Sequence, residues 1–223
     1  MPCLKCQRTV YLVRHGAVVG SHAATYVGQL ERSLSEEGLR QVLRLRAVLE
    51  NLPISSIHSS DLSRAMWTAQ ILGERRDLEF HAYPELREIN LGIWEGRSFA
   101  EIRRLFPNEF KARGNDFEHW RPPGGESFGD CRDRVLPAWH HILESSPGDV
   151  LVVGHASVNR IILSDVLGMP TANIFHIAQD YGCLNAIFYG EAGPQLKLLN
   201  YTPWGVPQPT DLKRAEEQLA FAD

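Results

Sequence analysis

The chain has 223 residues, a formal net charge of −4 at pH 7, and a composition that is 43% hydrophobic and 22% charged. This composition is typical of a globular protein with a substantial core, and it gives no broad basic surface for nucleic acid or an anionic membrane. The early apolar run Thr9 to Val13 is far too short to span a membrane and lacks the shape of a secretory signal. We therefore predict a cytoplasmic protein without a nucleic-acid or membrane partner, in which any anion site is local.

The four cysteines give no sign of a metal centre. Cys3 and Cys6 form a lone CxxC pair, and the second pair that a zinc ribbon requires is missing. The histidines show no HExxH or other paired-ligand pattern. We expect reduced, structural cysteines and a protein that uses neither a metal nor another cofactor.

The first predicted unit is a strand that ends in polar residues. Thr9 to Val13 is a short β-branched and apolar run, and Arg14 and His15 follow it directly. After a loop, Ser35 is a suitable N-cap for an amphipathic helix. The apolar residues expected on one face of this helix are Leu39, Val42, Leu43 and Leu49.

Two later units repeat this layout. Ile54 to Ile57 is strand-like, residues 59–61 (Ser, Ser, Asp) offer capping side chains, and Arg64 falls in the first turn of the next helix. The expected apolar stripe of that helix is Leu62, Ala65, Met66, Ala69 and Leu72. Val150 to Val153 is typical of a buried parallel strand, and a helix is expected over residues 157–167. His155 thus follows its strand as His15 follows the first.

The remaining elements complete an α/β pattern. Ser98 and Glu101 form a capping box for a helix that Pro107 should close. A helix from Ser127 toward residue 143 should kink at Pro137. Its expected inward residues are Phe128, Cys131, Val135, Trp139 and Ile142. Two late strands are predicted over residues 183–189 and 195–201, followed after Trp204 by a loosely attached or partly disordered tail.

Strands that alternate with helices predict an α/β fold, a three-layer sandwich whose largely parallel central sheet has helices on both faces. We expect a single domain over residues 1–223. The segment at about 89–126 interrupts the alternation, and we interpret it as an insertion covering the active site.

Chemically active side chains gather where the predicted strands end. Ligands of open α/β sheets bind beyond the carboxyl ends of the strands, where Arg14, His15 and His155 are expected, and Arg64 starts a helix at the same edge. Guanidinium groups match phosphate oxygens, and a helix N-terminus adds positive potential. The sequence therefore predicts a phosphate site.

These segments resemble the signature of the histidine phosphatase superfamily, the phosphoglycerate mutase-like family that includes cofactor-dependent phosphoglycerate mutases and α-ribazole phosphatases. The similar segments, in family order, are Tyr11 to Gly16, Tyr26 to Gln29, Leu34 to Gly38, Ser59 to Ala65, Leu86 to Gly92, Trp94 to Gly96, Gly124 to Ser127 and Val152 to His155. Their order over roughly residues 9–203 makes the resemblance far more specific than one triplet.

The resemblance implies a role for each site residue. His15 would be the nucleophile, Arg14 and Arg64 would bind the phosphoryl oxygens together with His155, and His155 would also stabilise charge during transfer. Glu88 matches the proton donor of the family. The catalytic set is thus His15, Glu88 and His155, without a metal, and the chemistry agrees because a neutral imidazole can attack phosphorus in line.

Some positions leave alternatives open. Glu85 is a rival to Glu88, which we favour because it stands in the Leu-Arg-Glu motif. Residues 17–20 replace acidic, aromatic and Asn residues that many relatives carry, and residues 156–157 lack the Asn typical of glycolytic mutases. The insertion is expected to select the alcohol through its arginines or aromatics, among them Arg97, Arg103, Arg104, Arg121, Trp94 and Trp120.

Three functions compete. We favour a phosphomonoester hydrolase that forms a phosphohistidine and acts on a small molecule, with motifs closest to the α-ribazole phosphatase branch. A cofactor-dependent phosphoglycerate mutase is the alternative, because it shares every catalytic residue. A non-catalytic phosphate-binding protein is remote, because the chain keeps both His15 and Glu88. The oligomeric state stays open, with a homodimer as one alternative.

Overall fold

The computed structural model describes residues 7–21 and 24–204. Its strands are β1 (Arg8–Arg14), β2 (Ile54–Ser60), β3 (Glu79–Tyr83), β4 (Asp149–Gly154), β5 (Leu184–Gly190) and β6 (Gly193–Tyr201). They form a six-stranded sheet in the order β3-β2-β4-β1-β5-β6. The strands from β3 to β1 pair in parallel, whereas β5 pairs antiparallel with both β1 and β6. The predicted α/β fold with a largely parallel sheet is confirmed.

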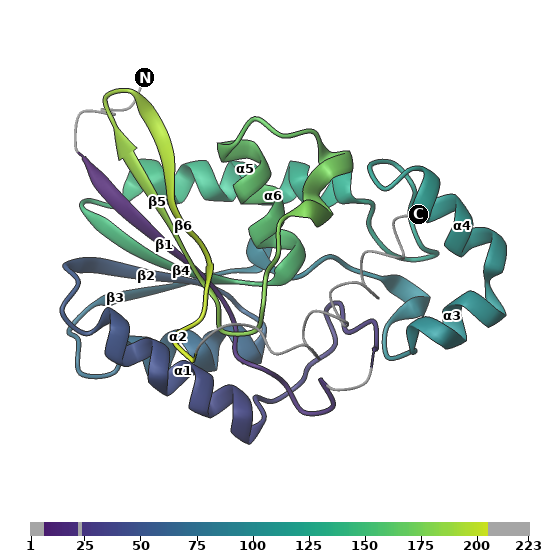
Figure 1. Ribbon diagram of the computed structural model, residues 1–223, viewed down its shortest axis with the longest axis horizontal. Coiled ribbons are helices and arrows are strands. Elements are labelled where there is room, and N and C mark those ends of the chain that lie inside the picture. Colours follow the sequence, from purple (N-terminus) through teal and green to yellow (C-terminus); the bar gives the residue numbers. More distant parts are fainter. Residues whose placement is uncertain (1–6, 22–23, 205–223) are drawn as a thin grey trace.

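Helices cover both faces of this sheet (Figure 1). α1 (Glu36–Leu49) and α2 (Ser63–Gly73) pack on one face, and α5 (Phe128–Ser145) and α6 (Ala156–Val166) on the other. α3 (Phe99–Leu105) and α4 (Pro107–Asn115) lie beyond the end of the sheet. The short 3-10 helices are η1 (Pro84–Leu86), η2 (Gly92–Trp94) and η3 (Thr171–His176). The three layers match the predicted sandwich.

The central strand β1 is buried on both faces. Because side chains alternate along a strand, Val10 and Leu12 join the core beneath α5 and α6, and Tyr11 and Val13 join the core beneath α1 and α2. Apolar packing on two sides fixes β1 in the middle of the molecule. Arg14, the last residue of β1, is therefore attached to a rigid strand.

Helix α1 begins as predicted but faces the core differently. The Ser35 hydroxyl accepts a hydrogen bond from the backbone N–H of Gly38 at 3.1 Å, which caps the helix. The buried stripe is Val42, Leu45 and Leu49, whereas the predicted core residues Leu39 and Leu43 are 41% and 46% exposed. The prediction was wrong for those two because a periodic pattern with several apolar positions fits more than one face.

Helix α2 also starts differently from the prediction. β2 continues to Ser60, and the N-cap residue Leu62 has no side-chain cap. The Ser60 hydroxyl instead accepts from the Leu62 N–H at 3.2 Å, and the Asp61 carboxylate binds Arg87. Only part of the predicted capping triplet therefore acts at this turn. The predicted stripe is buried except for Met66, which is half-buried.

Residues 89–126, the predicted insertion, contain a helix that the sequence pattern did not reveal. Ser98 and Glu101 form the predicted capping box of α3, and Pro107 follows its end. The same proline begins α4, because a residue without an N–H loses no hydrogen bond in the first turn of a helix. Strand β3 was also missed, since its residues are mostly exposed and show no apolar alternation.

Helix α5 confirms its predicted inward face. All five predicted residues are buried, Ser127 caps the helix, and the helix continues past Pro137 to Ser145. Cys131 and Cys183 are buried, unpaired thiols. Cys3, Cys6 and the predicted tail after Trp204 lie outside the described residues.

Candidate active site

His15 and His155 follow the ends of two adjacent parallel strands. Arg14 pairs with Gly154 in the register of β1 and β4, so the next residues, His15 and His155, leave the sheet side by side. Their ring centroids are 5.0 Å apart in an edge-to-face arrangement, and the side chains are 4% and 0% exposed. The structure therefore brings the two predicted histidines into contact.

The contacts of His15 define its tautomer. Its Nδ1 lies 2.8 Å from the Gly16 carbonyl oxygen, which can only accept, so Nδ1 carries the proton and donates. The other nitrogen, Nε2, is then unprotonated, and its lone pair accepts a hydrogen bond from Nε of Arg64 at 3.2 Å. Burial, followed by the charges of Arg64 and Arg14, holds the pKa of His15 well below its usual value. The ring is therefore neutral at pH 7, with its lone pair on Nε2.

Arg64 is held on three sides at the start of α2. Besides His15, it donates from Nη1 to the Leu30 carbonyl at 2.7 Å and from Nη2 to the Gly28 carbonyl at 2.6 Å. The side chain is 1% exposed. Burial lowers the pKa of Arg64, and the nearby Glu88 carboxylate opposes that effect most strongly. A buried guanidinium held by three hydrogen bonds is a fixed positive charge beside His15.

Arg14, the residue before His15, contacts the segment that carries Gln179 and Tyr181. Its Nη1 donates to the backbone carbonyl of Gln179, and its guanidinium carbon lies 3.7 Å from the centre of the Tyr181 ring. Its Nε is buried without a hydrogen-bond partner in the described structure. Arg14 thus presents a donor that the described residues leave unused.

The side chain of Glu88 contacts the N-terminus of α6. Its Oε1 accepts hydrogen bonds from the backbone N–H groups of Ile89 at 2.9 Å and Ser157 at 3.2 Å. Ser157 is two residues after His155, so the carboxyl group stands next to the second histidine. The rival carboxyl group, that of Glu85, belongs to an exposed residue in η1. The structure therefore places Glu88 with the predicted site residues.

Unpaired polar atoms mark the centre of this cluster. Both ring nitrogens of His155, like Nε of Arg14, are buried without a partner among residues 7–21 and 24–204. Buried polar atoms are nearly always hydrogen-bonded, so these three atoms without a partner point to a bound ligand that supplies hydrogen-bonding oxygens. Burial, then Arg64, His15 and Arg14, lower the pKa of His155 well below its usual value. A bound phosphoryl dianion would offset the charges of the two arginines.

The same part of the chain shows no alternative metal centre. Within the described residues, no three His, Cys, Asp or Glu side chains are placed to hold a metal ion. Two guanidinium groups beside buried polar atoms are features of an anion site.

The buried amides that support Arg14 were not predicted from the sequence. The Gln179 side chain, 3% exposed, donates from Nε2 to Oδ1 of Asn185 at 2.9 Å, and Asn185 donates to the Leu12 carbonyl at 3.0 Å. This network fixes the segment whose carbonyl binds Arg14. The available signal was a single Asn within the apolar run of β5, which by itself does not specify a partner.

The insertion is connected to Arg64 through the loop over residues 24–30. The Gly96 N–H donates to the Tyr26 carbonyl at 2.7 Å. Gly28 has a φ of 52°, and a Cβ atom there would lie 2.0 Å from Oε1 of Glu95. The Gly28 carbonyl also accepts a hydrogen bond from Arg64. A displacement of residues 89–126 that moved this carbonyl would therefore also move Arg64.

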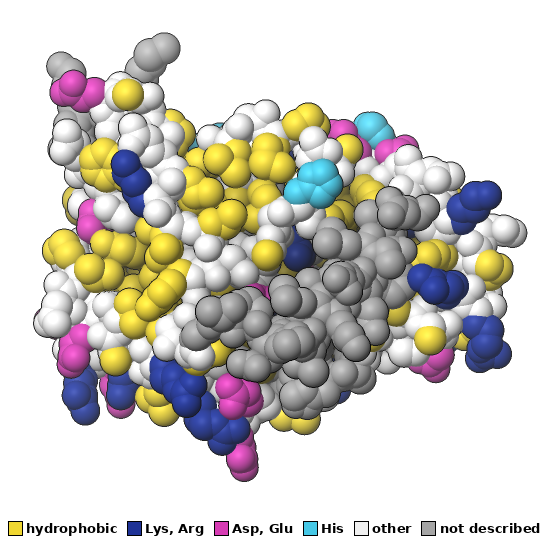
Figure 2. All heavy atoms as spheres, viewed as in Figure 1, with side chains coloured by type: hydrophobic (Ala, Val, Ile, Leu, Met, Phe, Trp, Pro, Cys, Tyr) yellow, Lys and Arg dark blue, Asp and Glu magenta, His cyan; other side chains and the backbone are white. Residues whose placement is uncertain are grey.

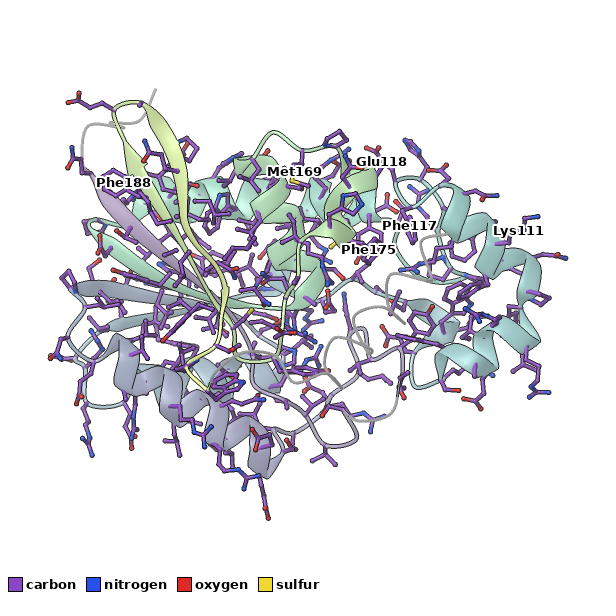
Figure 3. All side chains as sticks on the ribbon, viewed as in Figure 1. Lys111, Phe117, Glu118, Met169, Phe175 and Phe188 are labelled. Carbon is purple, nitrogen blue, oxygen red and sulfur yellow. The ribbon has the colours of Figure 1, made fainter. Side chains whose placement is uncertain are left out.

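Aromatic residues anchor the insertion. Trp94 and Phe128 are 0% and 2% exposed and belong to the core, so they do not line an open pocket. Phe117 lies against Phe175 of η3, with ring centroids 4.9 Å apart (Figure 3). The insertion therefore also packs on the segment that leads to Gln179 and Tyr181.

The four predicted insertion arginines lie mainly at the surface. Arg103, Arg104 and Arg121 are exposed, and Arg121 is paired with Asp130. Arg97 is half-buried and donates to the Ile93 carbonyl at 3.0 Å. No described contact places any of them against His15.

The visible surface carries mixed charge. In Figure 2, Lys and Arg side chains lie around the rim with Asp and Glu side chains beside several of them. Among the helices of the described ranges, none is long and apolar enough to cross a membrane.

Comparison with known proteins assigns this architecture to a family. Residues 10–202 match the model of the histidine phosphatase superfamily (branch 1). The adenosylcobalamin/alpha-ribazole phosphatase of Salmonella typhimurium is 32% identical over 197 residues, which cover 86% of this chain and 95% of that protein. A "Probable phosphoglycerate mutase" of Yersinia pestis is 36% identical over 165 residues, 72% of this chain and 75% of that protein.

A solved structure agrees. The crystal structure of the alpha-ribazole phosphatase from Shigella flexneri matches with a TM-score of 0.81 and 28% identity, covering 90% of this chain and 100% of that one. The resemblance predicted from the motifs is confirmed over most of the chain. The protein belongs to the histidine phosphatase superfamily and is a phosphatase with a small-molecule phosphate substrate.

Proposed function

We propose that the protein hydrolyses phosphomonoesters through a phosphohistidine on Nε2 of His15, with Arg14, Arg64 and His155 as phosphate ligands and Glu88 as the proton donor. The observation that carries this proposal is the unprotonated Nε2 of His15, which accepts from Arg64, near buried polar atoms of Arg14 and His155 that have no partner among the described residues. A neutral nucleophile, two fixed cations and a neighbouring carboxyl group are the parts that phosphoryl transfer needs.

The reaction has two balanced steps. Nε2 of His15 attacks phosphorus, the bond from phosphorus to the ester oxygen breaks, and protonated Glu88 gives its proton to the departing alkoxide. Water then attacks the phosphohistidine, Glu88 takes a proton from that water, and inorganic phosphate leaves with the imidazole restored. In both steps the guanidinium groups and His155 stabilise the charge on the equatorial oxygens.

The test is to trap the intermediate. Enzyme mixed with an ester carrying radioactive phosphate and denatured in base should retain the label, whereas denaturation in acid should release it, as expected of a phosphoramidate. His15→Ala should abolish labelling, and His176→Ala, which changes an exposed histidine of η3, should not. Labelling of His15→Ala at the wild-type level would exclude His15 as the nucleophile. Complete, metal-reversible loss of activity in a strong chelator would favour a metallophosphatase.

The proposed substrate is α-ribazole phosphate, because relatives named for that ester match almost the whole chain. The second candidate is phosphoglycerate mutase activity, supported by the relative from Yersinia pestis. A panel of α-ribazole phosphate, phosphoglycerates, sugar phosphates and an aryl phosphate separates them, with mutase activity measured alongside. Transfer back to a phosphoglycerate that exceeds phosphate release would favour the mutase.

The insertion at about 89–126 is proposed to cover the active site and select the alcohol within a single domain. Its hydrogen bond and steric contact with the loop over residues 24–30 support this role, because that loop supplies the Gly28 and Leu30 carbonyls to Arg64. Independence from nucleic acid and membranes, a cytoplasmic location and a homodimer stay predictions. Light scattering on the purified protein tests the dimer.

A further inference from the structure

We propose that Tyr181 is a positioning residue for Arg14, and that it acts through the face of its aromatic ring. The inference rests on the proposed function, which assigns Arg14 to the phosphoryl group. It concerns a residue outside the motifs that carry the family resemblance.

The geometry of the pair is that of a close stack. The guanidinium carbon of Arg14 lies 3.7 Å from the centroid of the Tyr181 ring. All N–H bonds of a guanidinium lie in its plane, so a ring on the face leaves every donor available at the edge. One edge donor, Nη1, is bound by the Gln179 carbonyl, and Nε remains unpaired. The stack therefore holds Arg14 while its edge stays open to an anion.

Arg14 needs such support because its surroundings repel it. The charge of Arg14 lowers the pKa values of His15, Arg64 and His155, so Arg14 lies near a second guanidinium, that of Arg64, beside two neutral imidazoles. Among the described residues, no ion pair joins Arg14 to a carboxylate. The negative face of an aromatic ring supplies attraction without occupying the in-plane donors, as a carboxylate would.

The backbone on both sides of Tyr181 is fixed. Before it, the Asp180 N–H donates to Oδ1 of Asn200 at 2.7 Å, and Nδ2 of Asn200 donates back to the Asp180 carboxylate at 2.7 Å. After it, the Gly182 N–H donates to the His15 carbonyl at 3.0 Å. Tyr181 is thus tied to the nucleophile's own backbone, and its ring centroid is 5.5 Å from that of His15.

The ring, and not the hydroxyl, makes these contacts. In the described structure the Tyr181 hydroxyl has no hydrogen-bond partner, whereas the ring touches both Arg14 and His15. Phenylalanine keeps the ring and removes the hydroxyl, and leucine removes the ring. Comparing Tyr181→Phe with Tyr181→Leu therefore separates a role of the hydroxyl from a role of the ring.

The experiment measures phosphate and vanadate inhibition of aryl phosphate hydrolysis, phosphate binding by calorimetry, and thermal unfolding. Tyr181→Leu should weaken phosphate and vanadate binding about three- to tenfold, the size of a partly desolvated cation–π contact. Because Tyr181→Phe keeps the ring, its phosphate and vanadate binding should stay within about twofold of wild type. Tyr201→Leu, in an aromatic residue of β6 that is 38% exposed, is the matched control and should change neither constant.

A double-mutant cycle shows whether Tyr181 acts through Arg14. In an Arg14→Lys background, which keeps the charge and removes the flat guanidinium, Tyr181→Leu should cause a smaller loss than in wild type. Equal losses in both backgrounds, no change in Tyr181→Leu, or equal losses in the Leu and Phe variants would each overturn the proposal. A wild-type protein that binds phosphate but hydrolyses no ester would refute the proposed function. Because calorimetry needs no turnover, the phosphate affinities of the Tyr181 variants would still test the role of Tyr181.

Discussion

Nε of Arg64 donates a hydrogen bond to Nε2 of His15 at 3.2 Å, so the proposed nucleophile is in contact with a cation before substrate arrives. The same guanidinium is held by two backbone carbonyls. A phosphoryl group entering above His15 therefore meets a donor whose position is already set, and little reorganisation is needed during transfer.

Arg64→Lys should show how much that fixed geometry contributes. Lysine keeps the charge but cannot bind two carbonyls and the anion together, so we expect kcat/KM to fall about 100-fold, with weaker vanadate inhibition. Arg76→Lys is the control, because Arg76 also binds backbone carbonyls, those of Leu49, Glu50 and Leu52, and lies between α2 and β3, outside the site motifs. Unchanged vanadate inhibition in Arg64→Lys would contradict the assignment.

Glu88→Gln tests whether Glu88 donates a proton to the leaving group, because the loss of activity should then depend on which leaving group the ester carries. An alkoxide needs a proton as it departs and a nitrophenolate does not, so kcat/KM should fall about 100-fold or more for an alkyl ester and far less for the nitrophenyl ester. Glu85→Gln, in the exposed neighbouring carboxyl group, should leave both values near wild type. A deficit of equal size for the two esters would mean that Glu88 is not the acid.

Gly28→Ala should disturb both the insertion and the anion site. The new methyl group would collide with Glu95 and displace the carbonyl that holds Arg64, so the protein should lose stability and bind phosphate more weakly. Gly168→Ala is a matched control, because Gly168 also has a positive φ, 62°, but a Cβ there meets nothing within 4 Å. The control should lose only about 1 kcal/mol of unfolding free energy and no phosphate affinity. Wild-type phosphate inhibition in folded Gly28→Ala would contradict the proposed connection between residues 89–126 and Arg64.

His58 should make the protein less stable in mild acid. Burial, followed by the charges of His81 and His141, lowers the pKa of His58 to about 4. Between about pH 4 and the ordinary histidine pKa of about 6.5, the unfolded chain binds a proton that the folded chain refuses, so the unfolding free energy falls as the pH falls through this window. Below about pH 4 this group causes no further loss.

Urea unfolding at several pH values checks this expectation. His58→Gln should flatten the pH dependence of the unfolding free energy across the window, whatever its effect on stability at pH 7. His176→Gln, in an exposed histidine, should keep the wild-type slope. An unchanged slope in His58→Gln would show that His58 does not titrate in this way.

The sequence predicted the parts of the site that follow from local patterns. Arg14 and His155 could be placed because short apolar runs mark buried strands, and polar residues directly after them lie at one edge of a parallel sheet. Tyr181 and Gln179 could not, because their importance arises only when the segment after η3 folds back against β1. Leu43 faces outward for a similar reason, since only the packed sheet decides which side of an amphipathic helix is covered.

The strand order has a consequence for the folding of a growing chain. β1 is the first strand of the described chain to be made, yet its neighbours are β4 and β5, so Val10 pairs with Val150 and Ile187. Local units such as β2 with α2 can form early, but β1 must wait until most of the chain has been synthesised. A nascent chain that ends before Asp149 therefore carries an apolar strand with no partner on either edge, a segment that chaperones would bind and that aggregates if they do not.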